Sequence, residues 1–101
     1  MVHIDAIVQP DAIRLFVRGE LDIAAAGAFD EALNEAGQMR DLVELDLARV
    51  EFIDGSGLST LMDAERRARL DRRRLRIVAA SRYVRRLIDI TDTGDCVSPL
   101  Q

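Results

Sequence analysis

The side chain of this chain best placed to do chemistry is the hydroxyl of Ser56, where a strand-like pattern gives way to a helical one. The strand-like run ends in Phe52 and Ile53, and Gly55 and Gly57 interrupt it before an amphipathic pattern begins. The first turn of a helix has unpaired backbone N–H groups and the positive end of the macrodipole. Both a hydroxyl and an added phosphate are therefore well placed at Ser56.

The same stretch also fits a purely structural turn. Gly55 and Gly57 would allow unusual backbone angles, and either Ser56 or Asp54 would cap the helix. It is not a Walker-type phosphate loop, because it lacks the longer glycine spacing and the lysine. The local residues taken alone favour the structural interpretation, and the phosphate-acceptor interpretation stays open beside it.

Few side chains suit catalysis or metal binding. His3 is the only histidine and Cys96 the only cysteine, so one chain cannot supply a serine triad, a zinc site of histidines and cysteines, or an internal disulfide. We expect His3 to be a solvated edge residue and Cys96 a small apolar one. Asp46 and Asp54 could bind a divalent ion, but such pairs are common on acidic strands. We therefore expect no enzyme activity, no cofactor and no metal.

Length and composition indicate a single globular domain over residues 1–101. Apolar residues make up 49% of the chain and charged residues 32%. No apolar run approaches the roughly 18 to 20 residues that a membrane span needs. The first residues lack the basic and apolar regions of a secretory signal, so we expect a cytoplasmic protein.

Charge is distributed unevenly along the chain. Residues 1–55 hold twelve acids and four arginines (net −8), whereas residues 56–101 hold six acids and ten arginines (net +4). Those ten lie between Arg66 and Arg86, and aromatic residues that could stack on bases are few. We therefore expect no nucleic-acid partner. The basic belt of Arg66, Arg67, Arg73 and Arg74 is predicted to be a solvated face, with a role in an interface as the alternative.

Alternation of apolar and polar residues predicts an opening β-hairpin, with strands at 4–8 and 13–17. Asp22 then fits the N-cap of a helix whose apolar residues recur at helical spacing from Ala25 to Ala36. Charged residues on the alternate strand positions imply that one face of the sheet is wet. The helices should therefore cover a single face.

A third strand is predicted at 43–47, with the run from Val50 to Ile53 leading into the Ser56 turn and a helix after it. A further strand is predicted at 75–80, followed by a helix that Ser81 caps. The strand at 75–80 is the most apolar and is expected at the centre. The order β-β-α-β-α-β-α predicts an α/β fold with a mixed sheet of four to five strands. A fifth strand is left open near Cys96 and Val97, and no final helix is expected.

The stretch from Asp54 to Gly57 resembles the switch motif of STAS domains, the fold of bacterial anti-sigma factor antagonists. The Gly-x-Leu-Asp turn at 19–22 and the element order from about residue 3 to residue 90 strengthen the resemblance. It implies that Ser56 is the site of regulatory phosphorylation, with Ser59 and Thr60 as other possible acceptors. The residues that it implies for partner binding are Asp22, Asp54, Gly55, Gly57, Leu58 and Leu61. The family usually adds a last helix, and many members have a second serine where this chain has Gly55.

The partner implied by the resemblance is an anti-sigma factor that is also a serine kinase of the histidine-kinase-like ATPase fold. The unphosphorylated antagonist would capture this partner, phosphorylation would release it, and a serine phosphatase would reset the cycle. A phosphate adds roughly −1.5 to −2 charges at neutral pH, so a surface built for a hydroxyl would repel it. The alternative is a STAS subunit of a larger assembly, such as a lipid-transporting ABC system or a stressosome-like scaffold, without a phosphate cycle.

Overall fold

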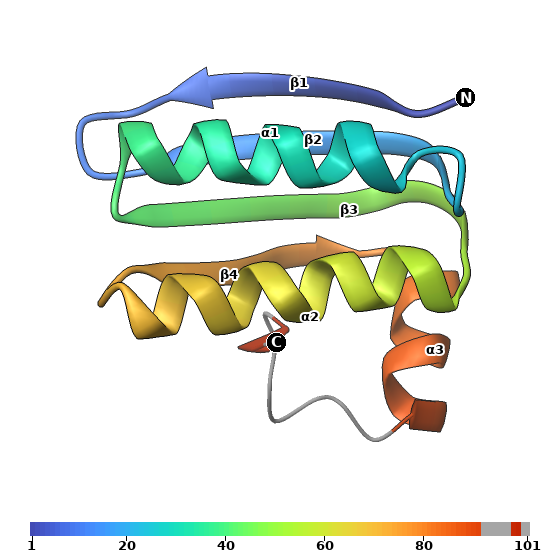
Figure 1. Ribbon diagram of the computed structural model, residues 1–101. Coiled ribbons are helices and arrows are strands. Elements are labelled where there is room, and N and C mark those ends of the chain that lie inside the picture. The colour runs from blue at the N-terminus through green and yellow to red at the C-terminus, as the bar shows by residue number, and fades with distance from the viewer. Residues whose placement is uncertain (92–97, 100–101) are drawn as a thin grey trace.

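The computed structural model describes residues 1–91 and 98–99, whose strands form one mixed sheet (Figure 1). The elements are β1 (His3–Val8), β2 (Ile13–Leu21), α1 (Ala26–Met39), β3 (Leu42–Ile53), α2 (Gly55–Leu70), β4 (Arg74–Ala80), α3 (Arg82–Thr91) and β5 (Ser98–Pro99). The predicted order of strands and helices is confirmed through α3. The predictions about Cys96, Val97 and a missing final helix fall outside the described residues.

Strand order in the sheet is β1-β2-β3-β4-β5. The hairpin β1–β2 is antiparallel and all other neighbours are parallel, which confirms the predicted mixed sheet of four to five strands. The expectation that the strand at 75–80 is central was wrong, because β3 occupies the middle. The apolar content of a strand indicates how far neighbouring elements bury it. It does not indicate the position of the strand in the sheet. β4 ends at Ala80, opposite Leu47, whereas β3 continues beside β2 to Ile53.

Two helices cover one face of the sheet. α1 and α2 lie side by side in front of the strands in Figure 1, as the predicted alternation requires. α3 begins where the N–H of Ser81 donates to the carbonyl of Leu47, and it packs chiefly against β3. Its Val84 and Ile88 are buried in the same core. The part of the chain that the structure describes has no helix long and apolar enough to cross a membrane.

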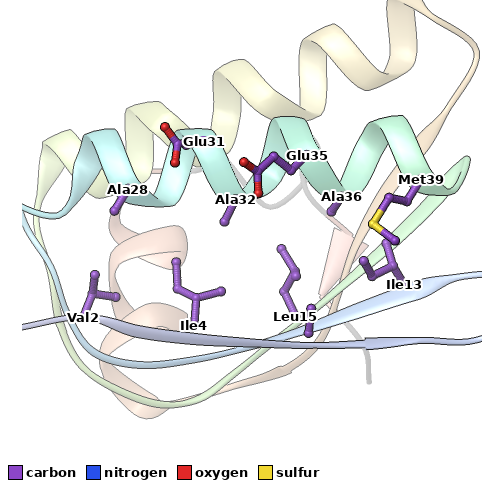
Figure 2. Close-up of a pocket in the computed structure, with 11 residues that line it drawn as sticks. Val2, Ile4, Ile13, Leu15, Ala28, Glu31, Ala32, Glu35, Ala36 and Met39 are labelled. Atoms are coloured by element: carbon purple, nitrogen blue, oxygen red, sulfur yellow. The ribbon is translucent and has the colours of Figure 1, made fainter.

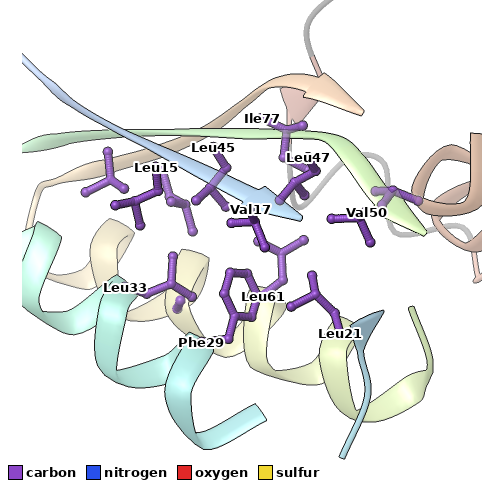
Figure 3. Close-up of a cluster of buried hydrophobic side chains, with 14 of the residues drawn as sticks. Leu15, Val17, Leu21, Phe29, Leu33, Leu45, Leu47, Val50, Leu61 and Ile77 are labelled. Atoms are coloured by element: carbon purple, nitrogen blue, oxygen red, sulfur yellow. The ribbon is translucent and has the colours of Figure 1, made fainter. Parts of the chain in front are cut away.

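The core lies between this helical layer and the sheet. In Figure 3, Phe29 of α1 and Leu61 of α2 point toward the strand side chains, and both are completely buried. Each such side chain stabilises the fold by about 1.5–3 kcal/mol relative to an exposed position. The strand residues that meet them are Leu15, Val17, Leu21, Leu45, Leu47, Val50 and Ile77.

The starts of two helices differ in how they are capped. α1 begins at Ala26, and its N-cap Ala25 makes no side-chain hydrogen bond, so the predicted cap at Asp22 was wrong. Asp22 instead closes the preceding turn, where its Oδ1 accepts from the N–H of Ala25 at 3.1 Å. Aspartate often bonds its own turn in this way and so delays the helix. Ser81 does cap α3, since its Oγ accepts from the N–H of Val84 at 3.4 Å.

The opposite face of the sheet carries charged side chains, as predicted. Glu44 of β3 is nevertheless only 9% exposed. Its Oε1 accepts from both Nε and Nη2 of Arg14 on the neighbouring strand, at 3.1 and 3.0 Å. This two-bond contact compensates the loss of water around the carboxylate.

Candidate functional site

Asp54 is the N-cap of α2. Its backbone is extended, and its Oδ1 accepts from the N–H groups of Ser56 at 2.9 Å and Gly57 at 3.1 Å. One carboxylate oxygen therefore satisfies two of the donors that a helix leaves free in its first turn. The expectation that these two N–H groups are unpaired was wrong, because Asp54, one of the two possible cap residues, accepts from both of them.

Ser56 therefore does not cap the helix with its side chain. Its side chain is half-buried, and its hydroxyl makes no hydrogen bond to any residue that the structure describes. Its backbone carbonyl accepts from Oγ1 of Thr60 at 3.0 Å, so that second hydroxyl is already engaged within the helix. Ser59 is exposed on the next turn. Ser56 thus offers a half-buried hydroxyl without a hydrogen bond beside the cap of α2, and Ser59 offers a more exposed hydroxyl against which it can be tested.

The turn around Ser56 is held against the end of β2. The N–H of Asp54 donates to the carbonyl of Leu21 at 3.3 Å, and Leu21 is the register partner of Ile53. Gly57 is buried against the same carbonyl oxygen, with no room for a Cβ. Asp22 follows Leu21 directly, so the turn that holds Asp22 and the turn that holds Ser56 lie side by side.

The six residues predicted to contact a partner differ in how exposed they are. Gly55 is exposed, and Asp22 and Asp54 are half-buried, so all three present surface. Leu58 is 7% exposed, Leu61 is completely buried, and Gly57 is buried. The prediction that these last three form contact surface was wrong. They lie on the side of α2 that packs against the sheet, which is where an amphipathic helix directs its apolar positions.

Two exposed apolar residues at this end of the sheet were missed. Ile23 is 77% exposed in the turn after Asp22, and Phe52 is 48% exposed on β3, one residue before the buried Ile53. Strand alternation could have indicated Phe52, because two consecutive strand residues point to opposite faces. No periodic signal marks Ile23, since it lies in a turn between elements.

The end of the sheet that carries Ser56 is acidic. The amino group of Met1 donates to Glu20 at 2.6 Å, and this hydrogen bond, followed by the charge of Glu20, raises the pKa of that amino group. The charges of Asp22 and Glu51 raise it further. With Asp54, four carboxylates lie where β2 and β3 end. Arg18, Arg49 and the Met1 amino group line the same surface as Glu20 and Glu51 and offset their charge. Asp22 and Asp54, the carboxylates beside Ser56, form no ion pair with any described residue and would disfavour an added anion.

The carboxylates considered for a divalent ion are engaged separately. Oδ1 of Asp46 accepts from the N–H of Ala48 at 3.0 Å, while Asp54 caps α2. Within residues 1–91 and 98–99, no group of three or more histidine, cysteine or acidic side chains could hold a metal ion.

Comparisons of the sequence with known proteins identify the family. Residues 6–99 match the family model described as "Mlab, STAS domain". The anti-sigma-B factor antagonist of Listeria monocytogenes is 32% identical over 89 residues, which cover 86% of this chain and 77% of that protein.

Solved structures show the same fold at lower identity. An anti-sigma factor antagonist from Mycobacterium paratuberculosis superposes with a TM-score of 0.87 at 21% identity, covering 99% of this chain and 86% of that one. Unphosphorylated SpoIIAA gives 0.77 at 17% identity (100% and 89% covered), and its phosphorylated form gives 0.73 at 16% (100% and 92%). This chain therefore belongs to the STAS domain family, whose members compared above are named as anti-sigma factor antagonists.

Proposed function

We propose that this protein is an anti-sigma factor antagonist that acts by binding, without catalysis, and that phosphorylation of Ser56 switches the binding off. The partner would be an anti-sigma factor with serine kinase activity, a serine phosphatase would restore the hydroxyl, and the cycle would run in the cytoplasm. The proposal rests on one observation at the start of α2, namely that Asp54 and not Ser56 is the capping residue. Asp54 caps the helix, which leaves the Ser56 hydroxyl half-exposed and without a structural task.

Capping by Asp54 predicts how phosphorylation of Ser56 would act. A phosphate on Ser56 would leave the bonds from Asp54 to the first turn in place, so the scaffold should keep its shape. The likeness of this chain to SpoIIAA in both its unphosphorylated and phosphorylated forms supports a fold that tolerates the modification. The effect would then fall on the surface. A loss of about 3 kcal/mol at the interface would weaken binding more than a hundredfold.

The contact surface in this proposal combines apolar and acidic groups. Ile23 and Phe52 supply exposed apolar side chains, and Gly55 leaves space above the start of α2, where an added Cβ would meet no atom within 4 Å. Asp22 and Asp54 supply the charge. A complementary partner presents an apolar patch that closes over the Ser56 hydroxyl. A phosphate there would have to lose its water inside the closed interface and would be repelled by Asp22 and Asp54, so it would oppose docking.

Phosphorylation is tested by incubating the protein with ATP and a candidate anti-sigma factor kinase. We expect intact-mass spectrometry to show the addition of one phosphate, and Ser56→Ala to abolish it. Ser59→Ala is the matched control, because it removes a more exposed hydroxyl from the next turn of the same helix. Phosphorylation that survives in Ser56→Ala and disappears in Ser59→Ala would contradict the proposed acceptor.

Partner binding separates the proposal from its alternative. Calorimetric titration of the anti-sigma factor should give similar affinities for the wild type and Ser56→Ala, and at least about a hundredfold weaker binding for Ser56→Asp. An interface that is unaffected by Ser56→Asp would favour a STAS subunit of a larger assembly without a phosphate cycle.

A further inference from the structure

A groove away from Ser56 runs between β1 and α1 and has a volume of about 350 Å³. Figure 2 shows Val2 and Ile4, on the β1 side, facing Ala28 and Ala32 of α1. The remaining lining residues are Ala6, Ile13, Leu15, Glu31, Glu35, Ala36 and Met39. The groove is thus apolar on its floor and carries two carboxylates on its helical wall.

The groove exists because the helical layer is narrower than the sheet. Neighbouring strands are about 4.8 Å apart and packed helices about 8–10 Å apart, so two helices cover roughly four strands at best. α1 packs against β2 and β3, and α2 packs against α1 and β4, so β1 extends beyond the helices (Figure 1). Val2 and Ile4 pack at the edge of the core and remain half-buried. A third helix beside α1 would complete the layer.

The charge on α1 indicates what kind of helix would fit. Glu31 and Glu35 are exposed, lie one turn apart, and form no ion pair with any described residue. Asp30, the residue before Glu31, is bound instead by Arg67 of α2 at 2.8 Å and faces the other helix. The side of α1 toward α2 is therefore neutralised within the chain, whereas the side toward the groove keeps two unpaired negative charges.

We infer that this groove binds an amphipathic helix of another protein, with an apolar stripe against Val2, Ile4 and Ala32 and basic side chains against Glu31 and Glu35. The wall from Ala28 to Met39 is about 16 Å long, so the bound segment needs only about three turns. A strand added at the outer edge of β1 would extend the sheet, but it would leave the apolar floor open and the two glutamates unused. An anionic lipid would meet the same glutamates and be repelled.

The probe is a synthetic 15-residue helical peptide with a leucine stripe and two arginines four residues apart, titrated into the ¹⁵N-labelled full chain. We expect amide shifts confined to β1 and α1, with no change near Ser56. A peptide with glutamates at the two arginine positions should bind at least about tenfold more weakly, because two attractive charge pairs become repulsive. Peptide-induced shifts centred on Ser56, or no shifts at millimolar peptide, would overturn the inference.

Paired variants test the charges independently of folding. Glu31→Gln with Glu35→Gln should weaken the arginine peptide about tenfold. Asp11→Asn with Asp41→Asn removes the same charge from exposed positions outside the groove and should not weaken it. Equal losses of peptide affinity in the two double variants would mean that only the net charge of the protein matters, and would contradict a specific site in the groove. Sedimentation could instead reveal a dimer, and the amides of β1 could be protected from hydrogen exchange without peptide. These two results together would assign the groove to a second copy of the chain and would also overturn the inference.

Discussion

Gly57 lies so close to the backbone carbonyl oxygen of Leu21 that a Cβ at residue 57 would overlap it. This contact joins the start of α2 to the end of β2, and the N–H of Asp54 adds a hydrogen bond to the same carbonyl. Two turns that are distant in the sequence are thereby fixed against each other. The relative placement of Asp22 and Ser56 depends on this close approach.

Gly57→Ala is expected to destabilise the protein by about 1–3 kcal/mol, because the new methyl must displace backbone and not a flexible side chain. Urea unfolding measures the free energy. Gly55→Ala is the control, since its added Cβ meets nothing within 4 Å and the substitution should stay within about 0.5 kcal/mol or stabilise slightly. Equal losses in the two variants would mean that helix propensity, and not the contact with Leu21, governs the effect.

Asp54→Ala should lower the free energy of unfolding by about 0.5–2 kcal/mol, the usual cost of losing an N-cap side chain. Asp54→Asn keeps an oxygen acceptor for the N–H groups of Ser56 and Gly57 and should lose far less. Thermal or urea unfolding of both variants checks this. If Asn and Ala were equally destabilising, the charge and not the hydrogen bonds would account for the role of Asp54.

Arg14→Ala is predicted to cost about 1–3 kcal/mol, because it leaves the 9%-exposed Glu44 without its hydrogen-bond donors. Arg18→Ala is the matched control on the same strand. Arg18 is exposed and has no carboxylate partner among residues 1–89, so its loss should cost under about 0.5 kcal/mol. Adding Glu44→Gln to Arg14→Ala should recover part of the lost stability, and a failure to recover it would argue against a desolvated charge.

Neutralising Arg66, Arg67, Arg73 and Arg74 to glutamine should leave affinity for the anti-sigma factor within about tenfold. Arg66, Arg67 and Arg73 already pair with Asp63, Asp30 and Asp71 at 2.8–3.2 Å, and these exposed pairs are worth little individually. Binding titrations at low and moderate salt measure the change. A larger loss that shrinks with salt would place the basic belt in the interface.

The sequence alone determined the type and order of the elements through α3 and located the switch-like turn. This was possible because a two-residue or 3.6-residue repeat of apolar side chains is a local property. Leu58 and Leu61 themselves follow the helical repeat, which places them on the inner side of α2 and should have excluded them from a contact surface.

Only the tertiary structure decided which groups are free. The sequence could not say that Asp54, and not Ser56, would take the first N–H groups of α2, since both residue types cap helices. It could not place β3 at the centre, nor show that β1 lies beyond the reach of α1. Periodicity specifies which side of an element faces inward, but exposure and hydrogen bonding depend on neighbours that only the packed sheet and helices bring together.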